Sequence, residues 1–556
     1  MRRLLRGRLR GRPLARSGRP EQLAAVLARH LQGVARPRVA VLGPAAEPLL
    51  DAVRHALPQA DVVEAPADDA ERHLLLARRG PFDAVLDRRV AAGDKTAVAG
   101  RRRRFQATFF HLRPGGVYVV PGGATELGPA PGALGGLLRR AAAEPGERFG
   151  RANRSVPVHI RLAIRDHVTA RADGADLVLT HDLPDVRIKF REDEFNALLD
   201  QMETPHRVVT VIPAEDPPPP PPTREGPEPR VPPIDRPISR ATISLREYRD
   251  VVVAPKQVLV DGRFLLPDTY RHNQWRRLQH TLLADAAPRF AITRRPLPAD
   301  PDRLDGTYLH LDNEFRGHFG HLLTESLSRV WSWPEALAID PEAKVLVGVT
   351  SKRPRPLEYE YLLYEACGIP RDRVVVLDHP VRVERLISGT PMFSHPQYVH
   401  PRIAETWLSV GDALAAQAEP RDWPRRFFAA RRTGKRACEN GAEVEAQFAQ
   451  RGFEILYPED FTLGEQVQLF RNAEVIAGYA GSGLFQIAFV PDPKRVIMIG
   501  AETYRPRNEY LMAAVHGHRV DSVICRSEGR GLQSSYRYDD EREGPFLRGI
   551  LDEIGG

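Results

Sequence analysis

A glycine-rich turn within residues 474–490 is the first part of this sequence whose residue types could do chemistry. An apolar strand leads into the turn, and an apolar helix follows it directly. Such a turn can present backbone N–H groups and a helix N-terminus to a phosphate, and Gly478, Gly481 and Gly483 have no side chain to obstruct a close approach. Because plain tight turns share this pattern, the surrounding elements must decide between a phosphate site and a structural turn.

A second stretch, residues 316–331, predicts an amphipathic helix with ionisable groups along one face. The apolar face carries Phe319, Leu323, Leu327 and Val330. The opposite face carries His318, His321, Glu325 and Arg329. Three interpretations are open: a solvated face, a metal site, and an active-site face where a carboxylate or imidazole deprotonates a hydroxyl group and the arginine neutralises a leaving phosphate. We expect no metal, because no further ligands cluster nearby.

A third stretch, residues 425–436, ends an expected strand in a cluster of cations. Arg431, Lys435 and Arg436 follow the apolar residues of that strand. The planar guanidinium group of arginine grips phosphate oxygens at two points, so a cluster at the carboxyl edge of a sheet suits a diphosphate. A basic surface loop is the alternative interpretation.

The elements around these stretches alternate between strands and helices. We expect strands at 308–311, 344–349, 374–377, 426–430, 453–457, 474–477 and 495–499, and helices at 317–333, 357–367, 441–451 and 463–472. Asn440 is a candidate N-cap, and Thr462 with Glu465 predicts a capping box. This alternation places the glycine turn at the carboxyl end of a parallel sheet, where α/β folds bind ligands.

A proline-rich stretch at 213–234 divides the chain. Proline removes backbone donors and favours an extended conformation, so we expect a semi-rigid spacer without a core. The α/β organisation that follows is a basic tail (1–20), a Rossmann-like domain (21–212), the linker (213–234) and a pair of Rossmann-like halves (235–410 and 411–556).

The first Rossmann-like domain resembles class I S-adenosylmethionine-dependent methyltransferases, through the segments FDAVLD and HLRPGGVYVV. We expect its strands at 39–42, 61–64, 82–87 and 117–120, and helices at 48–56 and 105–112. The glycine-rich first loop of that family is represented only by residues 43–46, whose proline and two alanines obstruct the backbone, and Glu64 stands where the family places its ribose-binding acid. We therefore expect a methyltransferase-like fold that does not use S-adenosylmethionine.

The second half resembles glycosyltransferase family 61 over residues 300–505, where three motifs stand in the family's order: HFGHLLTESLSRVW, FFAARRTGKRACEN and GFEILYPEDFTLGEQVQLFRNAEVIAGYAGSGLFQIAFVPDPKRVIMIG. The resemblance implies a GT-B pair of Rossmann-like domains and an inverting, metal-independent transfer from a nucleotide sugar. It also implies which residues contact the donor: Arg431, Lys435 and Arg436 at the diphosphate, and Gly478, Gly481, Ser482, Gly483 and Leu484 around the nucleotide. Asn440, Glu465 and Gln466 match further recurring positions, although helix caps explain the first two equally well.

The glycine turn departs from the family's pattern at Ala480, where many members have histidine. A phosphate or base contact is therefore missing or is supplied by another residue. The family often has an acid at the end of the next strand, whereas here Gly500 and Ala501 precede Glu502.

The net charge of +8 is concentrated at the N-terminus, where residues 1–20 hold eight arginines and no acid. Without these arginines, 72 basic residues face 72 acidic residues, so we expect no nucleic-acid partner. No apolar run is long enough for a signal peptide in this tail or for a membrane span elsewhere. We expect a cytoplasmic protein whose tail is either a solvated end or a contact with anionic lipid at the inner face of the membrane.

Together these patterns predict a bacterial-type glycosyltransferase that moves a sugar from a nucleotide-sugar donor to a glycan acceptor. Lipid-linked glycans are among the acceptors that we consider. Glu325 or His321 would be the base, no cofactor is required, and the resemblance suggests capsule or exopolysaccharide assembly. The alternatives are a methyltransferase that acts on a glycan and a catalytically inactive scaffold that binds nucleotides or sugars.

Overall fold

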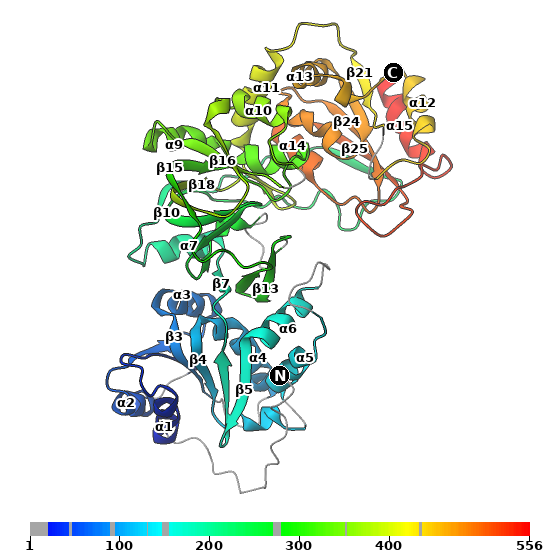
Figure 1. The fold of residues 1–556 in the computed structure, drawn as a ribbon. Helices are drawn as coiled ribbons and strands as arrows, with labels where there is room; N and C mark the ends of the chain where they lie inside the picture. Colours follow the sequence, from blue (N-terminus) through cyan, green and yellow to red (C-terminus); the bar gives the residue numbers. More distant parts are fainter. Residues whose placement is uncertain are drawn as a thin grey trace. The chain divides into compact units, whose positions relative to one another are not determined.

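The computed structural model describes residues 20–43, 47–88, 95–129, 132–146, 155–270, 278, 280–350, 353–432 and 436–555 of the chain (Figure 1). The chain forms two compact units: Met1–Thr204 with Leu259–Asp300, and Pro205–Val258 with Pro301–Gly556. The arginine-rich N-terminal tail lies outside the described residues. Within the described ranges, no helix combines the length and the apolar character that crossing a membrane requires.

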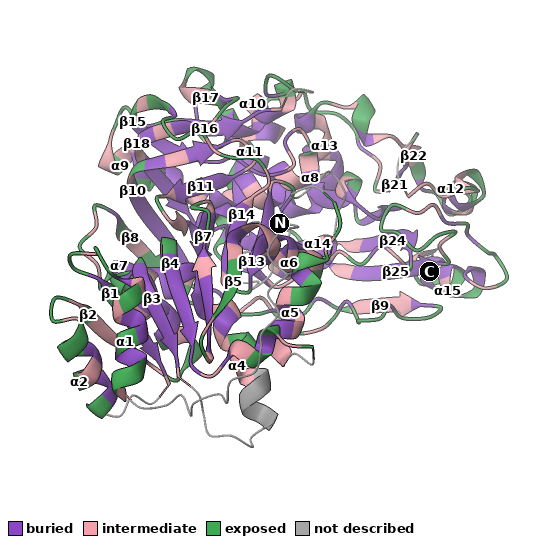
Figure 2. Cartoon of the chain, turned by 60° about the horizontal axis from the view of Figure 1, so that its bottom comes forward, coloured by how far each residue is buried: buried purple, intermediate pink, exposed green. Residues whose placement is uncertain are grey.

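A six-stranded sheet, in the order β2-β1-β3-β4-β6-β5, forms the centre of the first unit. Its strands are β1 (Arg38–Leu42), β2 (Asp61–Ala65), β3 (Phe82–Asp87), β4 (Leu112–Val120), β5 (Val168–Asp173) and β6 (Asp176–His181). The first four are parallel, and the β5–β6 hairpin joins β4 through antiparallel pairing. Every residue of β3 is buried, as Figure 2 shows in purple, because crossover helices cover both faces of a parallel sheet.

The helices of the first unit confirm the expected alternation with one change of boundary. They are α1 (Pro20–His30), α2 (Glu47–Ala56), α3 (Asp69–Arg79), α4 (Lys95–Thr108), α5 (Ala133–Ala142), α6 (Val156–His167) and α7 (Glu192–Leu199). The helix expected at 105–112 is wrong at its end, because a 3₁₀ turn follows Thr108 and Leu112 already begins β4. Gly115 therefore lies within β4 and does not end the helix. Its φ of +80° accompanies the register shift between β4 and β3.

A smaller group of strands completes the first unit. β7 (Val186–Lys189) pairs with β12 (Phe264–Leu265) on one side and β14 (Phe290–Thr293) on the other, and β13 (Leu283–Ala287) forms a hairpin with β14. β12 in turn pairs with β11 (Val258–Asp261).

The first sheet of the second unit combines four parallel strands with the antiparallel pairs that β10 forms. Its order is β8-β10-β18-β15-β16-β17, and the strands are β8 (Arg207–Ile212), β10 (Ile243–Ala254), β18 (Val381–Gly389), β15 (Asp302–His310), β16 (Lys344–Gly348) and β17 (Val374–Leu377). β15, β16 and β17 are parallel to one another, and β15 is also parallel to β18. The helices that follow in sequence are α8 (Phe319–His321), α9 (Trp333–Ile339), α10 (Glu358–Ala366) and α11 (Ile403–Ala415).

The second sheet of this unit is parallel throughout, in the order β22-β21-β23-β24-β25-β9. Its strands are β21 (Arg426–Ala429), β22 (Glu454–Leu456), β23 (Val475–Tyr479), β24 (Arg495–Ala501), β25 (Arg519–Cys525) and β9 (Thr223–Gly226). Its helices are α12 (Gly441–Ala449), α13 (Leu463–Asn472), the 3₁₀ helix Ser482–Phe489, α14 (Asn508–His516) and α15 (Gly544–Gly555). One hydrophobic core joins this sheet to the first, with Leu309 and Phe427 among its fully buried members. The expected α/β class is confirmed, and the GT-B arrangement stays a prediction.

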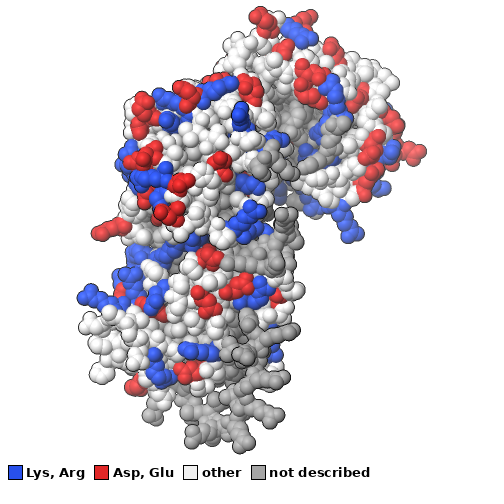
Figure 3. Space-filling model, in the orientation of Figure 1, with Lys and Arg blue, Asp and Glu red and all other residues white. Residues whose placement is uncertain are grey.

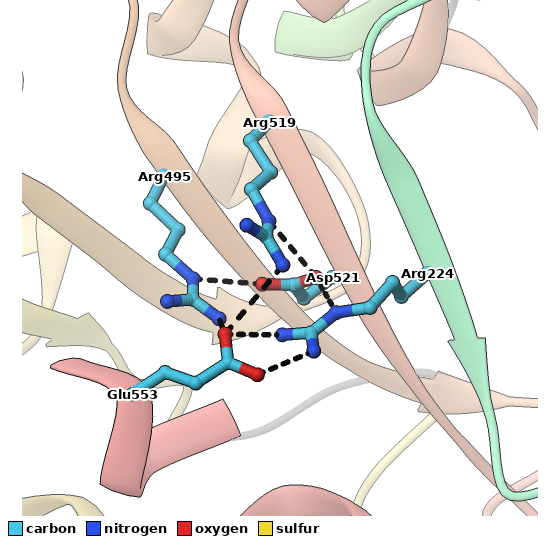
Figure 4. Close-up of polar contacts among 5 residues, drawn as sticks. All are labelled: Arg224, Arg495, Arg519, Asp521 and Glu553. Atoms are coloured by element: carbon cyan, nitrogen blue, oxygen red, sulfur yellow. Dashed lines mark hydrogen bonds and ion pairs between the residues drawn. The ribbon is translucent and has the colours of Figure 1, made fainter. Parts of the chain in front are cut away.

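The proline-rich stretch contributes the edge strand β9, which differs from the spacer that the sequence predicts. Thr223–Gly226 contain no proline and pair with β25 in parallel. Arg224 secures this strand, because its Nε donates to the fully buried carboxylate of Asp521 at 2.9 Å and its Nη1 donates to Glu553 at 2.7 Å (Figure 4). Arg495 donates to the same two carboxylates, and hydrogen bonds from Arg224 and then Arg495 lower the pKa of Glu553 to about 2.

Candidate active site

The glycine turn follows β23 and adopts a backbone conformation that favours glycine. Gly481 has φ +133°, and its N–H donates to Oε1 of the buried Glu509 at 2.7 Å. The N–H of Leu484 donates to the carbonyl of Gly481 at 3.0 Å. Both N–H groups therefore already have acceptors within the protein, and neither is a candidate donor to a diphosphate.

Ser482 and Gly483 present the turn's open backbone. Their N–H groups make no hydrogen bond within the described part of the chain. Gly483 is exposed, and a Cβ at this position would meet nothing within 4 Å. Gly478 differs, because a Cβ there would lie 2.8 Å from the carbonyl oxygen of Ala429 and 3.0 Å from Leu484. Gly478 thus permits close packing of β23 on β21, and Ser482 and Gly483 remain as the phosphate-facing candidates.

Two arginines from the third predicted stretch converge on this turn. Nη2 of Arg431 donates to the carbonyl of Ala480 at 3.2 Å. A Cβ on Gly481 would lie 3.3 Å from Nη2 of Arg431 and 3.0 Å from Nη2 of Arg436, so both guanidinium groups lie close against this glycine. Burial, and then the positive charge of Arg436, lower the pKa of Arg431. Two like charges held together in a partly buried site favour a bound anion.

A pocket of about 220 Å³ opens beside these arginines. It is lined by Arg431, Arg432, Arg436, Ala437, Cys438, Gly441, Ala442, Glu445 and Tyr479. The Tyr479 hydroxyl donates to Glu445 at 2.9 Å, so the one acidic side chain of the lining already has a partner. Lys435 lies outside the described residues. On the face seen in Figure 3, basic and acidic side chains are interspersed.

The His/Glu stretch is confirmed as helical, but it is not one regular helix. α8 passes into a π-helical turn at Leu322–Ser326 and then into a 3₁₀ segment at Leu327–Ser332. Nδ1 of His321 lies 2.6 Å from Oε1 of Glu325, and the imidazole of His321 stacks on Phe315 with ring centroids 4.5 Å apart. π-Helical turns of this kind often mark functional sites.

The change of helical type separates the predicted polar face. The rings of His318 and His321 remain neighbours, with centroids 4.8 Å apart. Arg329 is only 2% exposed, and its Nη1 donates to the carbonyl of Asp312 at 3.3 Å. The expectation that Arg329 shares an open face with His321 is therefore wrong, because the wider π turn rotates the following residues into the core.

Two of the predicted stretches meet at Gly320. A Cβ there would lie 2.9 Å from the ring of Phe485 and 3.2 Å from Cβ of Ser482. The helical segment that carries His321 and Glu325 therefore packs directly on the glycine turn. The arginines reach the same turn at Gly481, so the residues of all three predicted stretches gather around residues 480–485.

The supporting residues predicted from the sequence have structural contacts. Asn440 occupies the N-cap position of α12, but its side chain clamps Tyr538 through both a donated and an accepted backbone hydrogen bond of 2.9 Å. Glu465 forms the expected capping box with Thr462. Gln466 accepts a 2.8 Å hydrogen bond from Gln486 and so ties α13 to the helix after the glycine turn.

Sequence reasoning missed Glu509 and Tyr504, which lie directly behind the turn. Tyr504 donates its hydroxyl to Glu509 at 3.1 Å, and its ring lies under the guanidinium of Arg436 at 4.6 Å. Glu502, the acid that follows β24 in the sequence, accepts a hydrogen bond from the N–H of Ser527 at 3.2 Å. No local pattern marks Glu509, since it contacts the turn across 28 residues of sequence.

The first unit offers a different kind of pocket, of about 440 Å³, between the start of α3, the end of α4 and the start of α7. Gly43 does not line it, and residues 44–46 of the loop compared with the methyltransferase family lie outside the described residues. Glu64 is exposed near the end of β2. In the described part of the chain, no three His, Cys, Asp or Glu side chains are grouped as a metal site.

Comparison with known proteins adds two findings. Among solved structures, the chain is similar to the crystal structure of a protein-(glutamine-N5) methyltransferase (release factor-specific) from Alicyclobacillus acidocaldarius, with 16% identity, a TM-score of 0.19, and coverage of 30% of this chain and 94% of that one. Among curated proteins there is no match.

The glycosyltransferase 61 family model matches residues 319–497, which include His321, Glu325, Arg431 and the glycine turn. The segment 319–497 is therefore similar to glycosyltransferase family 61, and this match indicates an enzyme of the glycosyltransferase class.

Proposed function

We propose that the second unit transfers a sugar from a nucleotide-sugar donor to a hydroxyl group of a glycan acceptor, with inversion at the anomeric carbon. The observation that carries this proposal is the convergence of a histidine–carboxylate pair and an arginine pair on one glycine turn. One group suits the acceptor hydroxyl and the other suits the leaving diphosphate.

His321 is the proposed base. With a proton on Nδ1 shared with Glu325, the other ring nitrogen, Nε2, carries a lone pair that can accept the proton of the acceptor hydroxyl. Glu325 then stabilises the imidazolium that forms. The side chain of His321 is 21% exposed, so an acceptor hydroxyl can reach it. As the acceptor oxygen bonds to the anomeric carbon, the bond from that carbon to the phosphate oxygen breaks.

The leaving nucleoside diphosphate would be held by Arg431 and Arg436 together with the N–H groups of Ser482 and Gly483. Arginine pairs with phosphate oxygens through two parallel N–H donors, and these interactions strengthen as negative charge develops on the leaving oxygen. Because two guanidinium groups supply positive charge at this point, we propose that no metal is required. Arg431 and Arg436 would also supply the phosphate contact that many family members make through a histidine at the position of Ala480.

The wider setting is proposed from the family resemblance. We propose that the acceptor is a growing capsular or other extracellular polysaccharide, either free or linked to a lipid. We also propose that the enzyme works in the cytoplasm, at the inner face of the membrane. The arginine-rich residues 1–20 would contact anionic lipid there.

A thermal-shift experiment tests the donor class. Uridine diphosphate, guanosine diphosphate and S-adenosylmethionine are each added to the full chain and to the Arg431→Ala variant. The proposal expects a nucleoside diphosphate to raise the melting temperature of the wild type but not of the variant. A response to S-adenosylmethionine alone would favour the methyltransferase alternative. Binding of a nucleoside diphosphate without any sugar transfer, unaffected by His321→Ala, would favour the inactive scaffold.

A further inference from the structure

We propose that Glu509 and Tyr504 are positioning residues for the donor diphosphate: they fix the glycine turn and Arg436 from behind the pocket. This inference rests on the proposed function, because it concerns the same site. Neither residue lines the pocket beside the arginines, so both act through the groups that they hold.

Glu509 lies in the first turn of α14 and is 1% exposed. Its Oε1 accepts the N–H of Gly481 at 2.7 Å, and the Tyr504 hydroxyl donates to its two oxygens at 3.1 and 3.3 Å. A buried carboxylate that accepts several hydrogen bonds holds its donors in one geometry. Glu509 therefore sets the position of the backbone from which Ser482 and Gly483 follow.

Tyr504 carries the second part of the arrangement. The guanidinium carbon of Arg436 lies 4.6 Å from the centroid of its ring, so the ring forms a platform for that cation. The hydroxyl of the same ring is bonded to Glu509, and this bond fixes the ring's orientation. One carboxylate thus determines both the turn and, through the ring, one of the two arginines.

The proline-rich stretch stabilises this arrangement from a distant part of the sequence. Nη1 of Arg230 donates to the carbonyl of Tyr504 at 3.0 Å, and Nε of Arg230 donates to Glu225 of β9 at 2.6 Å. Both Arg230 and Glu225 are less than a tenth exposed. Since β9 pairs with β25, Tyr504 is held to the edge of the sheet through its backbone and to α14 through its side chain.

Removal of the Glu509 carboxylate would leave the buried N–H of Gly481 without an acceptor, and the turn would shift to satisfy it. The distance between the turn and the two arginines would then no longer match a diphosphate. Glutamine preserves this geometry, because its carbonyl oxygen can accept both the Gly481 N–H and the Tyr504 hydroxyl from the position of Oε1.

The test compares Glu509→Ala and Glu509→Gln with a matched control, Glu543→Ala. Glu543 is fully buried in the same unit, accepts the N–H of Asp539 at 2.6 Å and does not line the pocket. Affinity for uridine and guanosine diphosphate is measured by calorimetry, and melting temperatures are recorded for each variant. We expect Glu509→Ala to weaken nucleotide binding at least 10-fold, Glu509→Gln to remain within about 3-fold of the wild type, and Glu543→Ala to lose stability without losing affinity.

Each contrary result has a distinct meaning. Unchanged affinity in Glu509→Ala, or an equal loss of affinity in Glu543→Ala, overturns the positioning role and leaves the proposed function intact. A wild type that binds neither nucleotide overturns the proposed function together with this inference. If Glu509→Ala does not fold, Tyr504→Leu removes the platform under Arg436, and unchanged affinity in that variant equally overturns the inference. In turnover, a positioning role raises the KM for the donor and leaves the KM for the acceptor unchanged.

Discussion

Nδ1 of His321 lies 2.6 Å from Oε1 of Glu325, across the π-helical turn that follows α8. The pair fixes the direction in which the imidazole points, and a proton on Nδ1 leaves the lone pair of the opposite ring nitrogen available to accept a proton. The same helical segment packs on the glycine turn at Gly320. The histidine–carboxylate pair and the glycine turn are thereby held against each other by backbone packing.

The histidine–carboxylate pair should be essential for turnover and dispensable for donor binding. We expect His321→Asn to lower kcat by about 10²- to 10⁴-fold, because general-base catalysis contributes about this much. The dissociation constant of a nucleoside diphosphate should stay unchanged. His379→Ala is the control, since His379 is more than half exposed on a loop of the same unit. An equal loss of kcat in both variants, or full activity of His321→Asn, would refute the role of His321.

Arg431 should determine donor affinity. Arg431→Ala removes a charge-assisted contact worth about 1.5 to 3 kcal/mol, so we expect nucleoside diphosphate affinity to fall about 10- to 100-fold. Arg431→Lys should recover only part of this loss, because an ammonium group cannot form the paired contact. Arg425→Ala is the matched control, since Arg425 precedes the same strand and forms an exposed ion pair with Glu474. Equal affinities in the alanine variants at 431 and 425 would contradict the account.

The ion network behind β9 should matter for stability. Asp521→Ala leaves Arg224 and Arg495 without their fully buried acceptor, and we expect the free energy of unfolding to fall by about 3 kcal/mol. Asp305→Ala breaks an exposed ion pair with Arg303 and should change the free energy of unfolding by less than about 0.5 kcal/mol. Urea unfolding followed by tryptophan fluorescence gives both values. Similar free energies for the two variants would show that the network does not hold β9.

The first unit should lose stability as the pH falls below neutrality. Burial, and then the charge of Arg289, lower the pKa of His73 to about 3, whereas the unfolded chain has the ordinary value of about 6.5. Between these values the unfolded state binds a proton that the folded state excludes, so stability declines as the pH falls through this window, by on the order of 1 kcal/mol per pH unit. Thermal unfolding of His73→Gln at pH 7 and pH 5 should show a smaller difference than the wild type. The exposed His55→Gln should behave as the wild type does, and an undiminished difference in His73→Gln would be evidence against this assignment.

The sequence predicted the elements around the site better than the contacts within it. The glycine turn and its neighbouring strands followed from short apolar runs separated by glycine and capping residues, such as Thr462 with Glu465. The row of polar residues at 318–329 assumed 3.6 residues per turn, and a π-helical turn removed Arg329 from it. Local periodicity does not reveal where a helix changes type.

The contacts behind the turn could not be predicted for a different reason. Glu509 reaches Gly481 across 28 residues, and Arg230 reaches Tyr504 across 274. Such pairs leave no spacing signal in a single sequence. The proline content of 213–234 also concealed β9, because four residues without proline suffice for an edge strand.

The measurement that tests the central claim most directly is release of nucleoside diphosphate from a panel of nucleotide sugars, followed in the presence of glycan acceptors. We expect the wild type to turn over at least one donor, His321→Asn to bind that donor without turnover, and Arg431→Ala to lose affinity for it. A wild type that turns over no donor, or variants at both positions that retain full turnover, would contradict the assignment of this site.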